Sequence, residues 1–189
     1  MKRRRIFIAI NLPEFLKKRL IEFQKKQADL PFHWTKEMSL HLTVVFIGWV
    51  TDEQMLETCE LVKQAAKKFE SFEIVFNRLC YGPPGKPPRM IWLEGEPNVP
   101  LASMQKVLED ILFKSEQGSG SKQEARPYRP HITVGRLKNG APTQDLSPLS
   151  QKVDYRFSVE SIEVMESHLQ GDGAEYVILE SAELEGDRN

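Results

Sequence analysis

The chain has 189 residues, of which 40% are hydrophobic and 28% are charged, and its formal net charge is −1. This length suits one large domain or two small, tightly joined lobes with a real core, and the composition is that of an ordinary globular protein. The near-zero net charge excludes a global field that draws the protein to nucleic acid or to a membrane, so any anion binding must come from local charge.

The amino terminus places basic residues before apolar ones, as a secretory signal does. In MKRRRIFIAINLPEF the apolar run is only about seven residues long, and no small-residue cleavage site follows. We therefore interpret this stretch as a first strand. No segment approaches the ~20 apolar residues of a membrane span. Two cysteines, Cys59 and Cys80, make no disulfide framework, so we expect a cytoplasmic protein with no membrane partner.

Two strands and two helices are predicted in the first part of the chain. RIFIAINL (5–12) is apolar at successive positions, which is typical of a strand covered on both faces. A helix follows from Pro13 to about residue 28, with Phe15, Leu16, Leu20 and Phe23 on one side. HLTVVFIGWV (41–50) is the second strand. Thr51 and Gln54 then form a capping box for a helix whose apolar stripe is Met55, Cys59, Val62, Ala66 and Phe69.

The rest of the chain mixes strands with one more helix. Strands are predicted at 72–81, 89–95 and 131–137, with a turn rich in Pro and Gly between the first two. Asn98 is the predicted cap of a helix that ends near Gly118, and 116–126 has the composition of a flexible loop. Strands at about 155–169 and 175–184 are joined by the turn 171–173. Hairpins together with helical connections predict an α+β fold.

One tetrapeptide returns almost unchanged: HLTV at 41–44 and HITV at 131–134, which use two of the four histidines. Side chains alternate between the faces of a strand. His41 and Thr43 therefore point to one face and their apolar neighbours to the other, and the same holds for His131 and Thr133. Each copy presents one imidazole and one hydroxyl, and we expect both copies to face one shared cleft.

This pair of motifs suits the cleavage of a phosphodiester. The reaction needs a base for the attacking oxygen and an acid for the leaving oxygen, which lie on opposite sides of the phosphorus. Histidine titrates near neutral pH, so two histidines on opposite walls supply both functions without a metal. The hydroxyls of Thr43 and Thr133 are the candidate ligands for the non-bridging oxygens.

Cations and aromatic residues accompany the motifs. The stretch 125–138, ARPYRPHITVGRLK, holds Arg126, Arg129, Arg136 and Lys138 and no acid, while GKPPR adds Lys86 and Arg89. Such clustering is what an anion site requires in a protein of low net charge. Trp34 precedes the first motif and Tyr128 the second, so either ring is a candidate surface for a stacked base. We take Trp34, Tyr128, Arg136 and Lys86 as candidates for the substrate rim.

Other interpretations are open for single residues. One His-x-Thr on a strand is more often a satisfied structural histidine, and only the pairing makes the catalytic interpretation the better one. Zinc would need a third protein ligand, and neither motif has an Asp, Glu or Cys on its own face, so we expect no metal. We expect His33 to be a surface residue and His168 to be structural, while Cys59 is expected to pack in the core.

With these motifs the sequence resembles the 2H phosphoesterase superfamily, and more narrowly the RNA 2′,3′-cyclic phosphodiesterases, also called 2′-5′ RNA ligase-like proteins. The resemblance covers nearly the whole chain, through RIFIAINLP, HWTKEMSLHLTVVFIG, PPRMIWLEG, RPYRPHITVGRL and ESHLQGDGAEYVIL. It implies one bilobal, pseudo-twofold domain over residues 1–189, with antiparallel sheets that line a central cleft and helices outside. EMSLH departs from the Glu-Asn that commonly precedes Leu-His in the family, which leaves the rim contacts of Met38 and Ser39 open.

The resemblance also implies an activity. Members hydrolyse a 2′,3′-cyclic phosphate at an RNA end to a 2′-phosphomonoester, and the reverse reaction would join RNA ends through a 2′-5′ bond. His41 matches the proton donor, His131 the proton acceptor, Thr43 and Thr133 the phosphate-holding hydroxyls, and Arg129 a basic residue that often accompanies the second motif. No metal, cofactor or obligatory protein partner is implied, and we expect a monomer.

Two other functions fit the same motifs. One is the same chemistry on a small cyclic nucleotide, ADP-ribose cyclic phosphate or 2′-5′ oligonucleotides. The other is a non-catalytic RNA-binding module.

Overall fold

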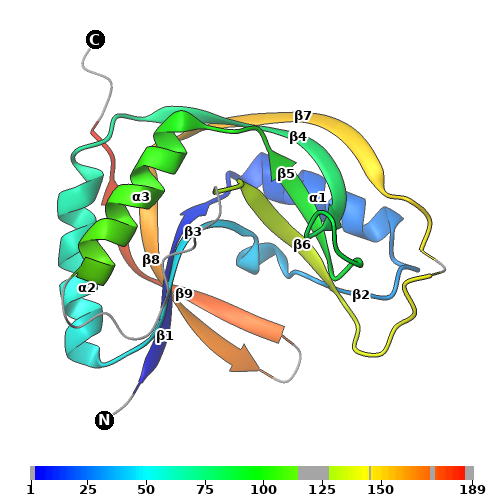
Figure 1. The fold of residues 1–189 in the computed structure, drawn as a ribbon, viewed down its shortest axis with the longest axis horizontal. Coiled ribbons are helices and arrows are strands. Elements are labelled where there is room, and N and C mark those ends of the chain that lie inside the picture. The colour runs from blue at the N-terminus through cyan, green and yellow to red at the C-terminus, as the bar shows by residue number, and fades with distance from the viewer. Residues whose placement is uncertain (1–2, 115–127, 145, 171–172, 186–189) are drawn as a thin grey trace.

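The structure is a computed structural model, which describes residues 3–114, 128–144, 146–170 and 173–185. Within these residues three α-helices and a short 3-10 helix accompany nine strands (Figure 1). In chain order the elements are β1 (Arg4–Asn11), α1 (Glu14–Lys26), β2 (Phe32–Trp34), η1 (Glu37–Ser39), β3 (His41–Val50), α2 (Asp52–Ala66), β4 (Phe72–Gly82), β5 (Met90–Gly95), α3 (Val99–Lys114), β6 (His131–Leu137), β7 (Ser150–Val159), β8 (Ser161–Gln170) and β9 (Gly173–Glu183).

The described strands form a single sheet in the order β7-β4-β5-β6-β3-β1-β8-β9, with β2 paired to β6, and neighbouring strands are antiparallel. Its two halves are joined between β3 and β6 by one residue pair, Leu42 with Ile132. The α+β class and the two-lobed arrangement are therefore confirmed, and the two expected sheets are halves of one sheet. Because β3 and β6 are the central strands, the two histidine motifs start side by side.

Both faces of β1 are covered, as its sequence predicts. Ile6, Ile8 and Ile10 belong to the main core, while Phe7 and Ala9 on the other face form a small cluster with Met165. All five side chains are almost fully buried. The small cluster lies on the face that carries the first histidine motif, because Phe7 contacts the ring of His41.

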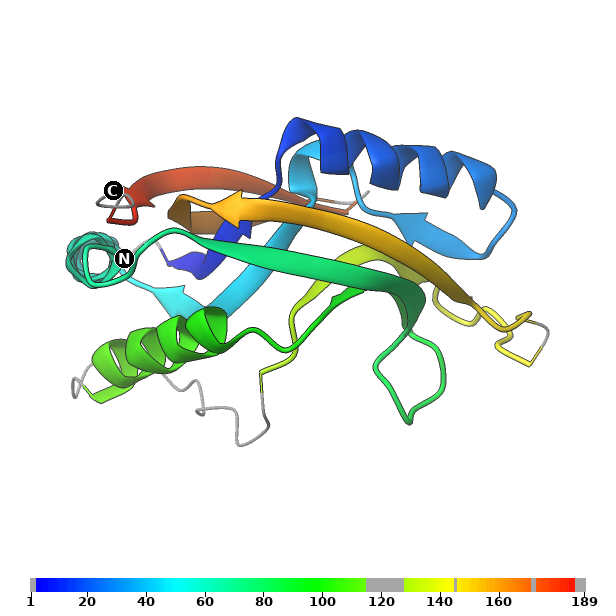
Figure 2. The ribbon, with the colours of Figure 1, turned by 90° about the horizontal axis from the view of Figure 1, so that it is seen from above.

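The helices cover different halves of the sheet (Figure 2). Helices α2 and α3 pack against each other, and α2 contacts β1, β3, β8 and β9. The predicted capping box of Thr51 and Gln54 is present on α2, and the Leu101 N–H donates to Asn98 Oδ1 at the start of α3. Helix α1 lies at the other half, where the Gln24 amide donates to the carbonyls of Thr35 and Val134. Leu16, Leu20 and Phe23 of α1 are buried as predicted, but Phe15 is 50% exposed, so its inward placement was wrong.

Two features of the strand pattern differ from the prediction. The strand expected at 155–169 is two strands, β7 and β8, which pair with β4 and β1 at opposite halves of the sheet. The chain changes direction at Glu160, where neither Gly nor Pro marks a turn. His33, expected in a loop, lies in the three-residue strand β2, which exists because it pairs with β6. The loop 116–126, the end of the third helix near Gly118 and residues 171–172 of the expected turn lie outside the described residues.

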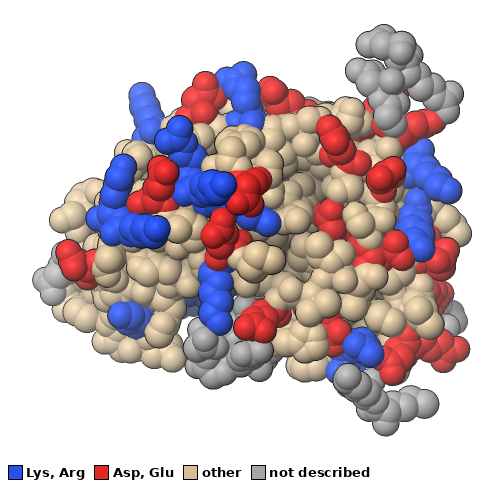
Figure 3. All heavy atoms as spheres, turned by 180° about the vertical axis from the view of Figure 1, so that it is seen from behind, with Lys and Arg blue, Asp and Glu red and all other residues tan. Residues whose placement is uncertain are grey.

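No helix in the described part of the chain is long and apolar enough to cross a membrane. Basic and acidic side chains are interspersed over the face seen in Figure 3, which agrees with the low net charge.

Candidate active site

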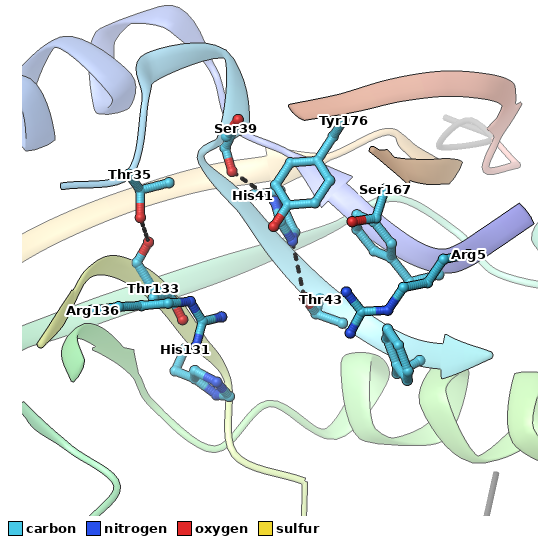
Figure 4. A pocket seen from close by; sticks show the side chains of 12 residues that line it. Arg5, Thr35, Ser39, His41, Thr43, His131, Thr133, Arg136, Ser167 and Tyr176 are labelled. Carbon is cyan, nitrogen blue, oxygen red and sulfur yellow. Dashed lines mark hydrogen bonds between the residues drawn. The ribbon is translucent and has the colours of Figure 1, made fainter. Parts of the chain in front are cut away.

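A cleft of about 210 Å³ opens between the two halves of the sheet, and both histidine motifs line it (Figure 4). His41 and Thr43 come from β3, and His131 and Thr133 from β6. The other lining residues are Arg5, Phe7, Thr35, Ser39, Phe46, Arg136, Ser167 and Tyr176. The structure thus brings together the four residues that the repeat singles out, on the face that strand alternation predicts.

The two imidazoles are anchored in the same way. His41 Nδ1 lies 2.8 Å from the Ser39 carbonyl oxygen, and His131 Nδ1 lies 2.9 Å from the Arg129 carbonyl oxygen. A carbonyl only accepts hydrogen bonds, so Nδ1 carries a proton in both rings. The neutral form of each ring therefore has its lone pair on Nε2. For His41, Nε2 lies 3.0 Å from the Thr43 hydroxyl.

The environments of the two rings differ. His41 is enclosed by aromatic rings, with Phe7 at 4.9 Å and Tyr176 at 4.8 Å between centroids. His131 is stacked on the indole of Trp92, with centroids 3.9 Å apart and 27° between the planes. Burial lowers the pKa of His41 from 6.5 to about 4; the bond to Ser39 opposes this shift, and the charges of Arg136 and His131 add to it. His41 is thus neutral at neutral pH.

Hydroxyl groups hold the backbone of both threonines. The Tyr128 hydroxyl donates to the Thr43 carbonyl at 2.6 Å, and the Thr35 hydroxyl donates to the Thr133 carbonyl at 2.9 Å. Burial raises the pKa of Tyr128, so its phenol stays protonated and remains a donor. Tyr128, predicted as a stacking surface for a base, is used here to join the segment before β6 to β3.

Two arginines face the cleft from opposite walls. Arg136 comes from β6 and Arg5 from β1, and their guanidinium groups extend toward the space between the motifs (Figure 4). Arg5 lies over the ring of Phe46, with Cζ 4.8 Å from the centroid, and no described acid forms an ion pair with it. Its neighbour Arg4 points away and pairs with Asp52 and Glu166. Arg5 and Arg136 thus leave positive charge in the cleft.

Besides Tyr128, three more of the predicted site residues do not line the cleft. Arg129 Nη1 donates to Glu94 Oε1 at 2.7 Å and lines a second hollow, so its contribution to the cleft is the backbone carbonyl that holds His131. Lys86 is exposed in the turn between β4 and β5 and does not line the cleft. Trp34 packs against Phe23 and Phe32 beside the core and is not among the described lining residues.

The structure also places cleft residues that the sequence did not indicate. Arg5, Phe7 and Tyr176 reach the cleft because β1 pairs with β3 and β8 pairs with β9, and no local pattern carries this information. Phe46 is 46% exposed and lines the cleft, although regular alternation from His41, five residues earlier, predicts the opposite face. A register shift between β1 and β3, at Ile8 and Ala9, interrupts the alternation before Phe46, and the sequence does not show it. Of the departures in EMSLH, Met38 is 84% exposed, whereas the Ser39 carbonyl anchors His41.

The remaining histidines lie apart from the cleft. His33 is exposed on β2, as the surface interpretation predicted, and His168 has its Nε2 3.4 Å from Glu166 Oε2. Among the described residues, no group of three or more His, Cys, Asp or Glu side chains is placed to hold a metal ion.

Comparison with known families agrees with the geometry. The family model described as the 2′-5′ RNA ligase superfamily matches residues 19–171. The chain belongs to this superfamily. It is 28% identical to the RNA 2′,3′-cyclic phosphodiesterase of Thermotoga maritima over 96% of both chains, and 29% identical to that of Thermus thermophilus over 97% of this chain and 91% of the relative.

Solved structures show the same fold. The crystal structure of Escherichia coli LigT complexed with 3′-AMP superposes with a TM-score of 0.76 at 22% identity, over 97% of this chain and 99% of that one. At this identity the likeness concerns the fold alone. The functional proposal therefore rests on two findings: the chain belongs to the 2′-5′ RNA ligase superfamily, and both His-x-Thr motifs line one cleft.

Proposed function

We propose that this member of the superfamily hydrolyses RNA 2′,3′-cyclic phosphate ends to 2′-phosphomonoesters by acid–base catalysis with His41 and His131. The observation that carries the proposal is the matched anchoring of the two rings by backbone carbonyls, with the threonine hydroxyls beside them in one cleft. The names of the relatives support the same activity class. We propose further that residues 1–189 work as one bilobal unit, because the cleft needs both halves.

The chemical step follows from the two positions. His131, neutral, accepts a proton through Nε2 from a water molecule, whose oxygen forms a bond to phosphorus. The bond from phosphorus to the ribose 3′-oxygen breaks, and His41 donates its proton to that oxygen. The product keeps the phosphate on the 2′-oxygen. When the 5′-hydroxyl of a second RNA attacks phosphorus in place of water, the bond to the 3′-oxygen breaks in the same way and the ends are joined through a 2′-5′ bond.

The low pKa of His41 sets a condition on this assignment. A ring with a pKa of about 4 is protonated in only a small fraction of free molecules at neutral pH. The cyclic phosphate carries a negative charge, and an opposite charge close to the ring favours its charged form. Binding of substrate thus supplies the proton donor, and the same anion is attracted by Arg5 and Arg136.

The hydroxyls of Thr43 and Thr133 are assigned to the non-bridging oxygens, where donors gain strength as negative charge develops. A base at the terminal nucleotide has Phe46 as an exposed surface and Arg136 on the other wall. The small volume of the cleft also supports a second candidate, a free cyclic mononucleotide as substrate, because 210 Å³ is below the range of most ligand pockets.

The deciding experiment uses a short RNA that ends in a 2′,3′-cyclic phosphate, incubated with the protein in excess EDTA. Mass spectrometry and sensitivity to phosphatase identify the product end. We expect a 2′-phosphate from the native protein and none from His41→Ala or His131→Ala. Turnover that EDTA abolishes, or turnover in both variants, contradicts the proposal. Binding of RNA without turnover favours the RNA-binding module, and competition by ADP-ribose cyclic phosphate tests the small substrates.

A further inference from the structure

A second hollow, which we call the side hollow, lies beside His131. It measures about 640 Å³ and is lined by residues of β4, β5, β7 and the segment before β6, among them Arg78, Glu94, Pro97, Arg129, Pro130 and Lys152. The proposed reaction uses none of its side chains. Its volume is in the range of pockets that hold small organic ligands, unlike that of the cleft.

The sheet register connects the side hollow to the cleft. Lys152 pairs with Arg78, Arg78 with Glu94, and Glu94 with His131, across four adjacent strands. Residues directly opposite one another in antiparallel strands project from the same face. This row therefore leads from the second histidine across one face of the sheet to the outer strand β7.

The side hollow has one more cation than acid in its lining, with Arg78, Arg129 and Lys152 against Glu94 and Glu96. Glu94 is 6% exposed and accepts hydrogen bonds from both Arg78 and Arg129, so one carboxylate is shared by two guanidinium groups. Lys152 is exposed, and no described acid forms an ion pair with it. Glu96 is bonded to the Asn77 amide. Apolar lining from Pro97, Pro130 and Val153 lies beside these cations.

We propose that the side hollow binds the nucleotide that precedes the cyclic end of a single-stranded RNA. The cations attract its phosphate, and the apolar lining accepts its sugar and base, a combination typical of sites that track a single strand. The inference rests on the proposed function and extends it, because it makes a polynucleotide end the preferred substrate over a mononucleotide.

The test compares kcat/KM for a 2′,3′-cyclic mononucleotide with that for a tetranucleotide ending in the same cyclic nucleotide. We expect the native protein to prefer the tetranucleotide at least about tenfold. Lys152→Glu should lower the ratio of the two kcat/KM values about tenfold, because a phosphate contact is lost. For the same reason, kcat/KM for the tetranucleotide should depend less steeply on salt concentration. Lys106→Glu, an equal charge change on the exposed face of α3, is the control and should keep the native ratio.

Equal kcat/KM for both substrates, or an unchanged ratio in Lys152→Glu, overturns the inference while the proposed function stands. Failure to hydrolyse either substrate overturns the proposed function itself. Arg78 and Arg129 are unsuitable as first variants, because removing either leaves the buried Glu94 carboxylate with one partner fewer.

A separate observation concerns the support of His131. Trp92, on which the ring stacks, is 7% exposed, and a Cβ at Gly82 would lie 2.3 to 2.8 Å from the indole atoms Cδ2, Cε2 and Cε3. Such contacts do not occur in folded proteins without a shift. Gly82 on β4 and His131 on β6 thus flank the indole of β5. We infer that Trp92 is a positioning residue for His131 and that Gly82 provides the space it needs.

The face of an indole attracts a cation, so the stack favours the protonated form that His131 takes when it accepts a proton. Trp92→Leu should lower kcat about threefold to thirtyfold with less change in KM, and should lower the pKa of His131 measured by NMR. Trp92→Phe keeps a ring and should restore much of both, while Gly82→Ala should resemble Trp92→Leu. Loss of activity with an unmoved His131 titration overturns the inference and leaves a packing function only.

Discussion

The two copies of the tetrapeptide are alike in their local bonds and unlike in their surroundings. Each histidine donates from Nδ1 to the carbonyl two residues earlier. Yet His41 is enclosed by Phe7 and Tyr176, whereas His131 stacks on Trp92. The repeated sequence thus fixes the tautomer, and strands from other parts of the chain fix the readiness of each ring to take a proton. Equal motifs can in this way perform unequal steps.

The largest expected effect comes from removing either ring. His41→Ala and His131→Ala should each lower kcat about 10²- to 10⁴-fold, because each removes one proton transfer. The double variant should be little worse than the single ones, since acid and base act as a unit. Single-turnover rates with the cyclic-phosphate RNA measure this. If the losses in the double variant were additive, the two rings would act independently and would not form an acid–base pair.

The threonines come next. Thr43→Val and Thr133→Val should each lower kcat about 10²-fold, because each removes a donor to the developing charge. Thr43→Val should also alter the pH dependence, because Thr43 contacts His41 Nε2. Serine at either position keeps the hydroxyl and is the matched control. Equal activity of the valine and serine variants would exclude hydroxyl donation.

The pKa of His41 offers a measurement on the resting protein. NMR titration should give a value far below 6.5, and inorganic phosphate should raise it, because an anion in the cleft stabilises the charged ring. A value near 6.5 without phosphate would show that burial does not hold His41 in its neutral form.

The same shift affects stability. Between pH 6.5 and 4 the unfolded chain binds a proton at His41 that the folded protein excludes, so stability falls as the pH is lowered through this window. At about 1.4 kcal/mol per pKa unit, the loss is about 3 kcal/mol at its limit. Urea unfolding at pH 7 and pH 4.5 should show a smaller difference for His41→Asn than for the native protein. An identical difference would assign the acid sensitivity to other groups.

The smallest effects should come from the helix caps, which serve as controls for the cleft. Thr51→Ala and Asn98→Ala should each cost about 1 kcal/mol of stability, because each removes a bond to an N-terminal amide of α2 or α3. The pH profile of catalysis should stay native. A changed profile would mean that the helices tune the rings, and the asymmetry would then extend beyond the cleft.

The sequence predicted those features whose cause is local. Strands β3 and β6 were predicted with their observed limits, and the capping box of Thr51 and Gln54 marks the end of β3. The shared face of His41 and Thr43 follows from strand geometry alone. The boundary at Glu160 was missed because it is set by strand pairing. The segment before Glu160 pairs with β4 and the segment after it pairs with β1, and no Gly or Pro marks the change in the sequence.

Adjacency to the motifs in the sequence did not reliably predict which side chains lie in the cleft. Arg129 was assigned to the phosphate because it precedes His131 closely, but its side chain donates to the buried Glu94 carboxylate. Arg5, Trp92 and Tyr176 were missed because only the strand order brings them to the motifs. The ion pairs of Glu94 and the packing of Trp92 against Gly82 join residues from different strands, so no periodic pattern in the sequence predicts them.

The single residue pair between β3 and β6 has a mechanical consequence. Leu42 and Ile132, both fully buried, each follow a histidine directly, so the joint of the sheet lies one residue from both imidazoles. If the two halves rotated about this pair, the outer strands would move much farther than the two imidazoles, because the imidazoles lie next to the axis. The joint between β3 and β6 therefore places both proton-transfer groups where a rotation of the halves would displace them least.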